Sequence, residues 1–129
     1  MRITRRFVTL LLAFALPLSG ALASDHGGGE AGASTPMVFT VNLGTERYLQ
    51  VGLLTEAATP EAAQLFAARK PRFLHRVILL LGEQLPESLM TLQGKLKLQE
   101  SILDIANEVI DERPKTGIRE VLFSNFIIQ

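Results

Sequence analysis

The residues of this sequence that could do chemistry are few and widely spaced. Asp25, His26 and Glu30 supply two carboxylates and an imidazole, a combination that can bind a metal ion. They stand in a glycine-rich stretch, which offers ligands neither a fixed geometry nor supporting hydrogen bonds. The pattern is more typical of a solvated linker, and we predict no metal site and no cofactor.

A second imidazole, His75, lies between Arg72 and Arg76. A catalytic histidine needs a group that orients it and a nucleophile or substrate within hydrogen-bonding reach. No acidic residue or cysteine is close to His75 in the sequence. A histidine at the surface or at the edge of the core is therefore the favoured interpretation.

Nucleophilic and acid–base catalysis also lack a recognisable arrangement. Hydroxyl groups stand near apolar segments, but none lies in a nucleophile motif: Ser88, Thr91, Ser101 and Ser124. The adjacent carboxylates Asp111 and Glu112 fall at the predicted end of a helix, where burial and pKa tuning are not expected. We predict no catalytic residues, no small-molecule substrate and no enzymatic activity. A hydrolase or metal-dependent enzyme is the least favoured class.

The first residues indicate export. Arg2, Arg5 and Arg6 precede an uncharged apolar run, and Ala21-Leu22-Ala23 supplies the small residues at which a signal peptidase cuts. We predict that residues 1–23 are a signal peptide or, if uncut, an N-terminal membrane anchor. The run from Phe7 to Ala23 has 17 residues, the lower limit of the roughly 17–25 that span a bilayer. In either case the rest of the chain is expected on the periplasmic side of the inner membrane.

The remainder divides into a linker and one domain. Residues 24–36 are rich in glycine and small polar residues and are predicted to form a flexible linker. Residues 37–129 are long enough for one domain, and the absence of cysteine leaves its stability to an apolar core. Three of the 13 basic residues lie in the predicted signal. Residues 24–129 therefore contain 10 basic and 13 acidic residues, which gives them a net charge of −3. Nucleic acid is therefore not an expected partner.

Two segments predict a β-hairpin. Apolar residues alternate along 37–43, and 47–56 resumes an extended pattern after the short connection 44–46. A connection of that length joins antiparallel neighbours. Gly52 in the second strand indicates a bulge or a close approach by another segment.

The C-terminal segment 118–129 is predicted to be a third strand. Val121, Phe123 and Ile127 would lie on one face, and Leu122, Phe126 and Ile128 on the other, so that both faces are apolar. This pattern predicts a strand in the middle of the sheet or one packed on both faces.

The sequence between the second and third strands predicts helices. Thr59 and Pro60 begin a helix expected to run to about Lys70, where Pro71 would end it and start a second helix reaching about Gln84. The run Val77–Leu81 also fits a buried strand, but its length and spacing favour the helix. A short helical turn is predicted for 86–90.

The longest amphipathic helix is predicted for 95–112. Its apolar stripe includes Leu98, Ile102, Ile105 and Val109. Glu100, Asp104 and Glu108 form an acidic row on the other side, which is either solvent surface, the favoured interpretation, or a face for a basic partner. The fold class is α+β, a small antiparallel-rich sheet made of the hairpin and the C-terminal strand, with helices packed on it.

Four segments in order resemble the flagellar basal body protein family FliL. The segment 37–43 (MVFTVNL) resembles the first strand of the family, and 47–51 (RYLQV) its second strand. Gly94-Lys95 with Leu98 and Ile102 is similar to the opening of the long helix, and 121–129 (VLFSNFIIQ) to the C-terminal end. Each motif is short, but their order and spacing together are specific.

The resemblance implies a periplasmic domain like the SPFH domain of stomatins. It also implies a ring that surrounds or supports the stator units of the flagellar motor and is needed for full torque, swimming or swarming. The implied partners are stator and basal body proteins, further copies of the chain, and the inner membrane if residues 1–23 are retained. The alternative function is a periplasmic stomatin-like scaffold or binding module outside the flagellum.

This sequence departs from the family pattern in two places. Many members carry an Arg-Asp pair at the start of the second helix, where Leu74-His75-Arg76 has no acid. Members are also usually held by an uncleaved helix, whereas Ala21-Leu22-Ala23 predicts cleavage.

Overall fold

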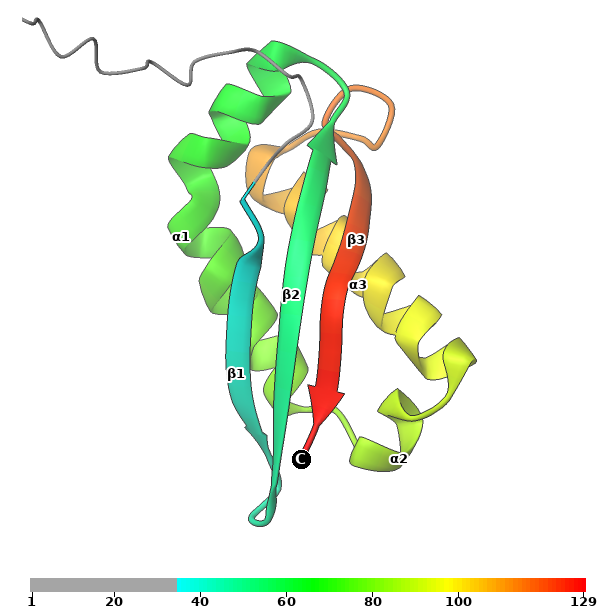
Figure 1. Ribbon diagram of the computed structural model, residues 1–129. Helices are drawn as coiled ribbons and strands as arrows, with labels where there is room; N and C mark the ends of the chain where they lie inside the picture. Colours follow the sequence, from blue (N-terminus) through cyan, green and yellow to red (C-terminus); the bar gives the residue numbers. More distant parts are fainter. Residues whose placement is uncertain (1–34) are drawn as a thin grey trace, which may run out of the picture. The chain divides into compact units, whose positions relative to one another are not determined.

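The computed structural model describes residues 35–129, which form three strands and three helices (Figure 1). The elements are β1 (Met37–Leu43), β2 (Arg47–Ala57), α1 (Pro60–Gly82), α2 (Pro86–Leu89), α3 (Leu92–Ile110) and β3 (Ile118–Ile128). The α+β class is confirmed, with a three-stranded antiparallel sheet and helices packed on it. The predicted signal and nearly all of the predicted linker, residues 1–34, lie outside the described residues.

The hairpin between β1 and β2 is confirmed. Gly44 takes a left-handed conformation, φ 67°, in the turn, a conformation that costs glycine little. The pairing of β2 with β3 shifts register between Gly52 and Leu53, as the glycine indicated. A Cβ at Gly52 would collide with the side chain of Ser124, so the close approach is confirmed as well.

The predicted central position of the C-terminal strand is wrong. The strand order is β1-β2-β3, so β2 is the central strand and β3 is an edge strand. Nor is β3 packed on both faces: Val121 is buried against the helices, whereas Leu122 is 39% exposed and Ile127 40% exposed. Apolar residues on both faces of a strand thus need not mean that both faces are buried. Here one face is buried against the helices and the other is an apolar surface that remains exposed in a single copy of the domain.

The predicted break at Pro71 is also wrong, because α1 continues through it from Pro60 to Gly82. Pro71 lies on an exposed side of the helix. On the buried side Phe66 and Phe73 pack edge to face, with ring centroids 4.9 Å apart, one on each side of the proline. This packing links the turns on either side of the proline and so helps the helix to continue despite the lost backbone hydrogen bond. The helical assignment of Val77–Leu81 is confirmed.

The helix ends follow local rules. Thr59 caps α1 as predicted, since its Oγ1 accepts from the Ala62 N–H at 3.1 Å. The long helix α3 begins at Leu92, three residues before its predicted start, because Thr91 caps it and accepts from the Gly94 N–H at 3.0 Å. It ends at Ile110, and the C-cap residue Asp111 adopts the left-handed conformation with φ 55°.

One core lies between the sheet and the helices. Helix α1 packs over the β1 side of the sheet and α3 over the β3 side, and α2 packs against α3 (Figure 1). The residues that are fully shielded from solvent include Leu49, Val51, Leu53, Phe73, Val77, Leu81, Leu89 and Ile102. Within residues 35–129 no helix covers the other face of the sheet, which we call the outer face.

Candidate interaction site

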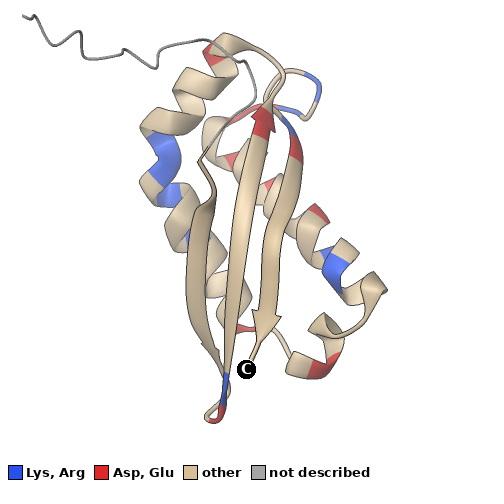
Figure 2. Cartoon of the chain, viewed as in Figure 1, with Lys and Arg blue, Asp and Glu red and all other residues tan. Residues whose placement is uncertain are grey.

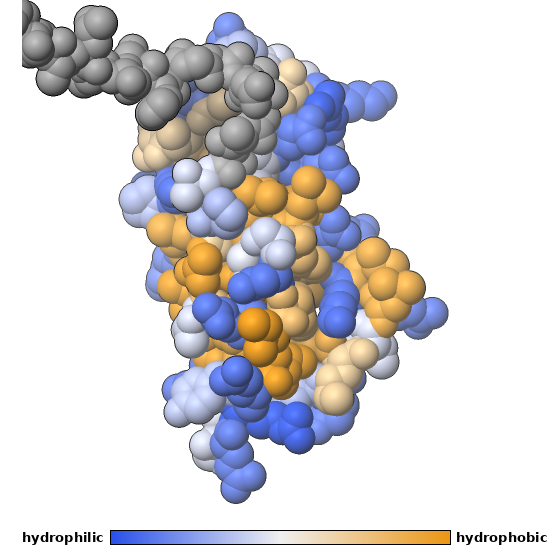
Figure 3. Space-filling model, in the orientation of Figure 1, coloured by the Kyte–Doolittle hydropathy of each residue, from blue (hydrophilic) through white to orange (hydrophobic). Residues whose placement is uncertain are grey.

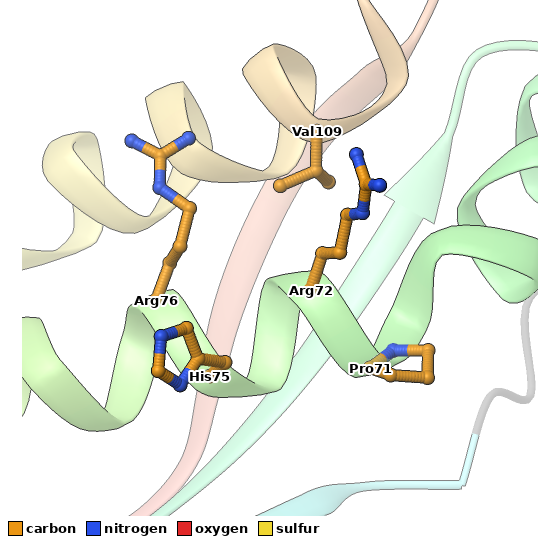
Figure 4. A pocket seen from close by; sticks show the side chains of 5 residues that line it. All are labelled: Pro71, Arg72, His75, Arg76 and Val109. Atoms are coloured by element: carbon orange, nitrogen blue, oxygen red, sulfur yellow. The ribbon is translucent and has the colours of Figure 1, made fainter.

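The histidine considered for catalysis lies in an open depression. His75 is exposed on α1 and, with Pro71, Arg72, Arg76 and Val109, lines a cavity of about 490 Å³. The two arginines extend toward α3 on either side of Val109, while His75 points away from them (Figure 4). None of the five lining residues is a carboxylate or a nucleophile, so the cavity does not place the partners that a general base requires.

Several of the hydroxyl and carboxyl groups considered above have structural roles. The Thr91 hydroxyl caps α3, and Ser101 Oγ donates to the Lys97 carbonyl at 3.0 Å. Asp111 ends α3, and Glu112 accepts from the Thr116 hydroxyl at 2.6 Å. Among residues 35–129 no three acidic or histidine side chains come together as a candidate metal site. Asp25, His26 and Glu30 lie outside the described residues.

The acidic row on α3 is exposed along its whole length, as expected for solvent surface. Glu108, at one end of the row, forms an ion pair within the domain, because its Oε2 lies 2.5 Å from the Arg76 guanidinium of α1. Arg69 makes a second link between the two helices by donating to the Val109 carbonyl at 3.1 Å. The row therefore begins at the contact between α1 and α3 and continues away from it through Asp104 and Glu100.

The outer face of the sheet is unusual for its lack of charge. The strand segments 37–43, 48–55 and 121–129 contain no acidic or basic residue, and the charges of the sheet gather at its two ends (Figure 2). Apolar side chains are exposed on this face, including Val38 at 59% and Tyr48 at 56% together with Leu122 and Ile127. Figure 3 shows hydrophobic areas among hydrophilic ones on the surface of this face.

Exposed surface of this composition is more typical of a protein interface than of a solvated sheet face, because the centres of interfaces are depleted in charged residues. Sequence reasoning missed the outer face. The signal was present in the uncharged segments of all three strands, but the apolar residues of 118–129 were assigned to burial inside the sheet.

Residues 34–129 match the model of the family described as flagellar basal body-associated protein FliL. The chain belongs to the FliL family. Its association with the flagellar basal body, and hence with motility, follows from that membership, and the resemblance inferred from the four motifs is confirmed.

The FliL family is a structural component of the flagellum. No curated protein matches the chain. None of the helices in the described part of this FliL domain combines the length and hydrophobicity required to cross a membrane.

Proposed function

We propose that this FliL protein is an exported component of the flagellar motor that forms a ring around the stator units and supports their torque. The observation that carries the proposal is the family match over 34–129. The uncharged outer face supports it, because a ring that also contacts stators needs apolar surface for protein partners. The protein acts through contacts, without a substrate or a cofactor.

The proposed organisation has three parts. Residues 37–129 form the periplasmic domain, 24–36 link it to the N-terminal segment, and 1–23 are a signal peptide or an anchor in the inner membrane. The positive charges at Arg2, Arg5 and Arg6 keep the start of the chain on the cytoplasmic side. If residues 1–23 are removed, attachment to the motor depends on contacts of the domain alone.

Deletion of the gene tests the motor role. The deletion strain should assemble filaments in normal number but swim and swarm less, and beads attached to its filaments should show lower torque or fewer stator steps. The full chain supplied in trans should restore both. Normal torque, swimming and swarming in the deletion strain would contradict the proposal.

N-terminal sequencing of the protein from membrane and soluble fractions tests the organisation. A chain that begins at Ser24 shows cleavage after Ala23, and one that begins at Met1 shows a retained anchor. The matched control is Ala23→Gln, which removes the small residue next to the cut and should give only the chain that begins at Met1. A first residue inside 37–129 would contradict the proposed organisation.

A further inference from the structure

Much of the exposed apolar surface of the domain comes from one short stretch of the chain. Ten large hydrophobic residues are exposed among the described residues, and six of these lie between positions 78 and 96. Each of the six is 48–73% exposed, and we call them together the apolar elbow: Ile78, Leu79, Leu85, Met90, Leu92 and Leu96. Exposed apolar surface gathered in this way marks a site of contact with a partner or a membrane.

The apolar elbow is the corner at which the chain turns from α1 through α2 into α3. It lies at the end of the domain that also holds the turn between β1 and β2 (Figure 1). Ile78 and Leu79 belong to the last turns of α1, and Leu92 and Leu96 are one helical turn apart at the start of α3. Their high exposure places these side chains on the outside of the corner.

The corner itself is firmly packed. Leu89 anchors α2 in the core and is fully shielded from solvent. The backbones of α2 and α3 approach closely, since a Cβ at Gly94 would overlap the Ser88 carbonyl. The Thr91 hydroxyl strengthens this contact, because it donates to the Ser88 carbonyl at 2.9 Å and accepts from the Gly94 N–H at 3.0 Å. Binding through the elbow therefore requires little ordering of its backbone.

The composition of the elbow fits lipid better than protein. None of its six side chains is aromatic or charged, whereas the residues that dominate protein interfaces are enriched in tryptophan, tyrosine and arginine and depleted in leucine. The charges within 78–96 are those of Glu83, Glu87 and Lys95, which provide no cluster of one sign to steer a charged partner. Leucine, isoleucine and methionine side chains are suited to the boundary between lipid headgroups and acyl chains.

The proposed organisation also brings a bilayer within reach of the elbow. Residues 24–36, as a flexible glycine-rich chain, would span about 20 Å on average. The strand that follows them, β1, runs toward the elbow end of the domain over a similar length, about 20 Å (Figure 1). A domain tethered by this linker can thus contact the membrane with its elbow, and tethering raises the effective concentration so that a small apolar surface suffices.

We propose that the apolar elbow inserts into the periplasmic leaflet of the inner membrane, to the depth at which headgroups meet acyl chains. Only side chains enter the bilayer, and the helices of the elbow lie on its surface. This inference rests on the proposed function, which places the chain at the inner membrane. It adds a point of attachment that persists if residues 1–23 are removed.

The absence of tryptophan from the sequence allows a direct test. The full-length chain carrying Leu92→Trp is reconstituted into phosphatidylcholine vesicles with or without brominated acyl chains, which quench a tryptophan only where it reaches the hydrocarbon. Its emission should lie at shorter wavelength than in detergent-free buffer with the elbow exposed, and the brominated chains should remove most of the intensity. The matched control is Val38→Trp, a position 59% exposed on the outer face of the sheet, which should keep its intensity.

Two further variants relate the signal to apolar contact at the elbow. Leu96→Asp added to Leu92→Trp places a charge among the inserted side chains and should abolish the quenching. Ile127→Asp makes the same kind of change on the outer face and should leave the quenching of Leu92→Trp intact. The quenching should also persist in 1 M NaCl, because salt screens charges and does not weaken apolar contacts. Circular dichroism verifies that each variant is folded.

Four results would overturn the proposal. They are an unquenched Leu92→Trp in a folded chain, equal quenching of Val38→Trp, loss of the quenching in high salt, and capture of a protein instead of lipid by a photocrosslinker at position 92 in living cells.

Motility separates this inference from the proposed function. A deletion strain with reduced torque and an unquenched Leu92→Trp variant would overturn the membrane contact alone. A fully motile deletion strain with a quenched Leu92→Trp variant would overturn the motor role and leave the membrane contact supported.

Discussion

The carboxamide of Asn107 holds both backbone groups of Ile118. Asn107 Nδ2 donates to the Ile118 carbonyl and Asn107 Oδ1 accepts from the Ile118 N–H, each at 2.8 Å. Asn107 is only 4% exposed and is the one buried polar residue of the described core. It mimics a neighbouring strand at the point where the chain leaves α3 and enters β3, and so fixes the start of the C-terminal strand.

Replacement of Asn107 should therefore destabilise the domain strongly. Asn107→Ala leaves a buried donor and a buried acceptor on Ile118 unsatisfied, which should cost about 2–4 kcal/mol. Urea denaturation followed by circular dichroism measures the loss. Asn107→Asp keeps an acceptor for the Ile118 N–H but buries a charge and turns an oxygen toward the carbonyls of Leu103 and Ile118, so it should cost at least as much as Asn107→Ala. A loss below about 0.5 kcal/mol for the alanine variant would contradict this role.

Two helical glycines should respond to alanine in opposite directions. A Cβ at Gly94 would overlap the Ser88 carbonyl, whereas nothing lies within 4 Å of a Cβ at Gly82. Gly94→Ala must push α2 away from α3 and should cost about 2 kcal/mol or more, as overpacking does. Gly82→Ala should stabilise the domain by up to about 1 kcal/mol through helix propensity. Thermal melts of the two variants check the signs, and equal shifts would contradict the close contact at Gly94.

Most elements of the fold could be predicted from the sequence because local chemistry determines them. The turn at Gly44 and the cap at Thr59 each depend on a few adjacent residues. The position of β3 in the sheet does not. Whether Leu122 and Ile127 are buried depends on what lies beyond the sheet, and the period-two pattern of one strand contains no information about that.

The interaction surfaces were harder to predict for the same reason. The acidic row of α3 can be recognised in the sequence as a periodic pattern. The ion pair between Glu108 of this row and Arg76 cannot, because it depends on how α1 packs against α3. The hydrogen bonds by which Gln99 and Asn107 hold the beginning of β3 likewise depend on how α3 packs beside that strand, which only the structure shows.

Pro71 offers a test of the uninterrupted α1. Its ring removes one backbone hydrogen bond from the middle of an otherwise regular helix, and its side chain is exposed. Pro71→Ala should restore the bond and stabilise the domain by about 1–3 kcal/mol. Chemical denaturation provides the measurement, with Ala68→Ser, an exposed change in the same helix, as a control expected to stay within about 0.5 kcal/mol. A destabilised Pro71→Ala would show that the helix needs the bend that proline imposes.

The ion pair between Arg76 and Glu108 should contribute little to stability although it links two helices. Both side chains are largely exposed, and such pairs typically contribute about 0–1 kcal/mol. Arg76→Glu creates a like-charge contact and should cost at most about 1 kcal/mol, and Arg76→Glu/Glu108→Arg should recover most of it.

Phe73→Ala tests apolar packing in place of charge. It removes a fully buried ring between α1 and the sheet and should lower the free energy of unfolding by about 3–5 kcal/mol. Repeating the urea titrations in 1 M NaCl separates the two causes. Salt should remove most of the Arg76→Glu effect by screening and leave the Phe73→Ala effect unchanged. If the Arg76→Glu loss exceeded 2 kcal/mol or persisted in high salt, then charge, and not apolar packing, would be holding α1 against α3.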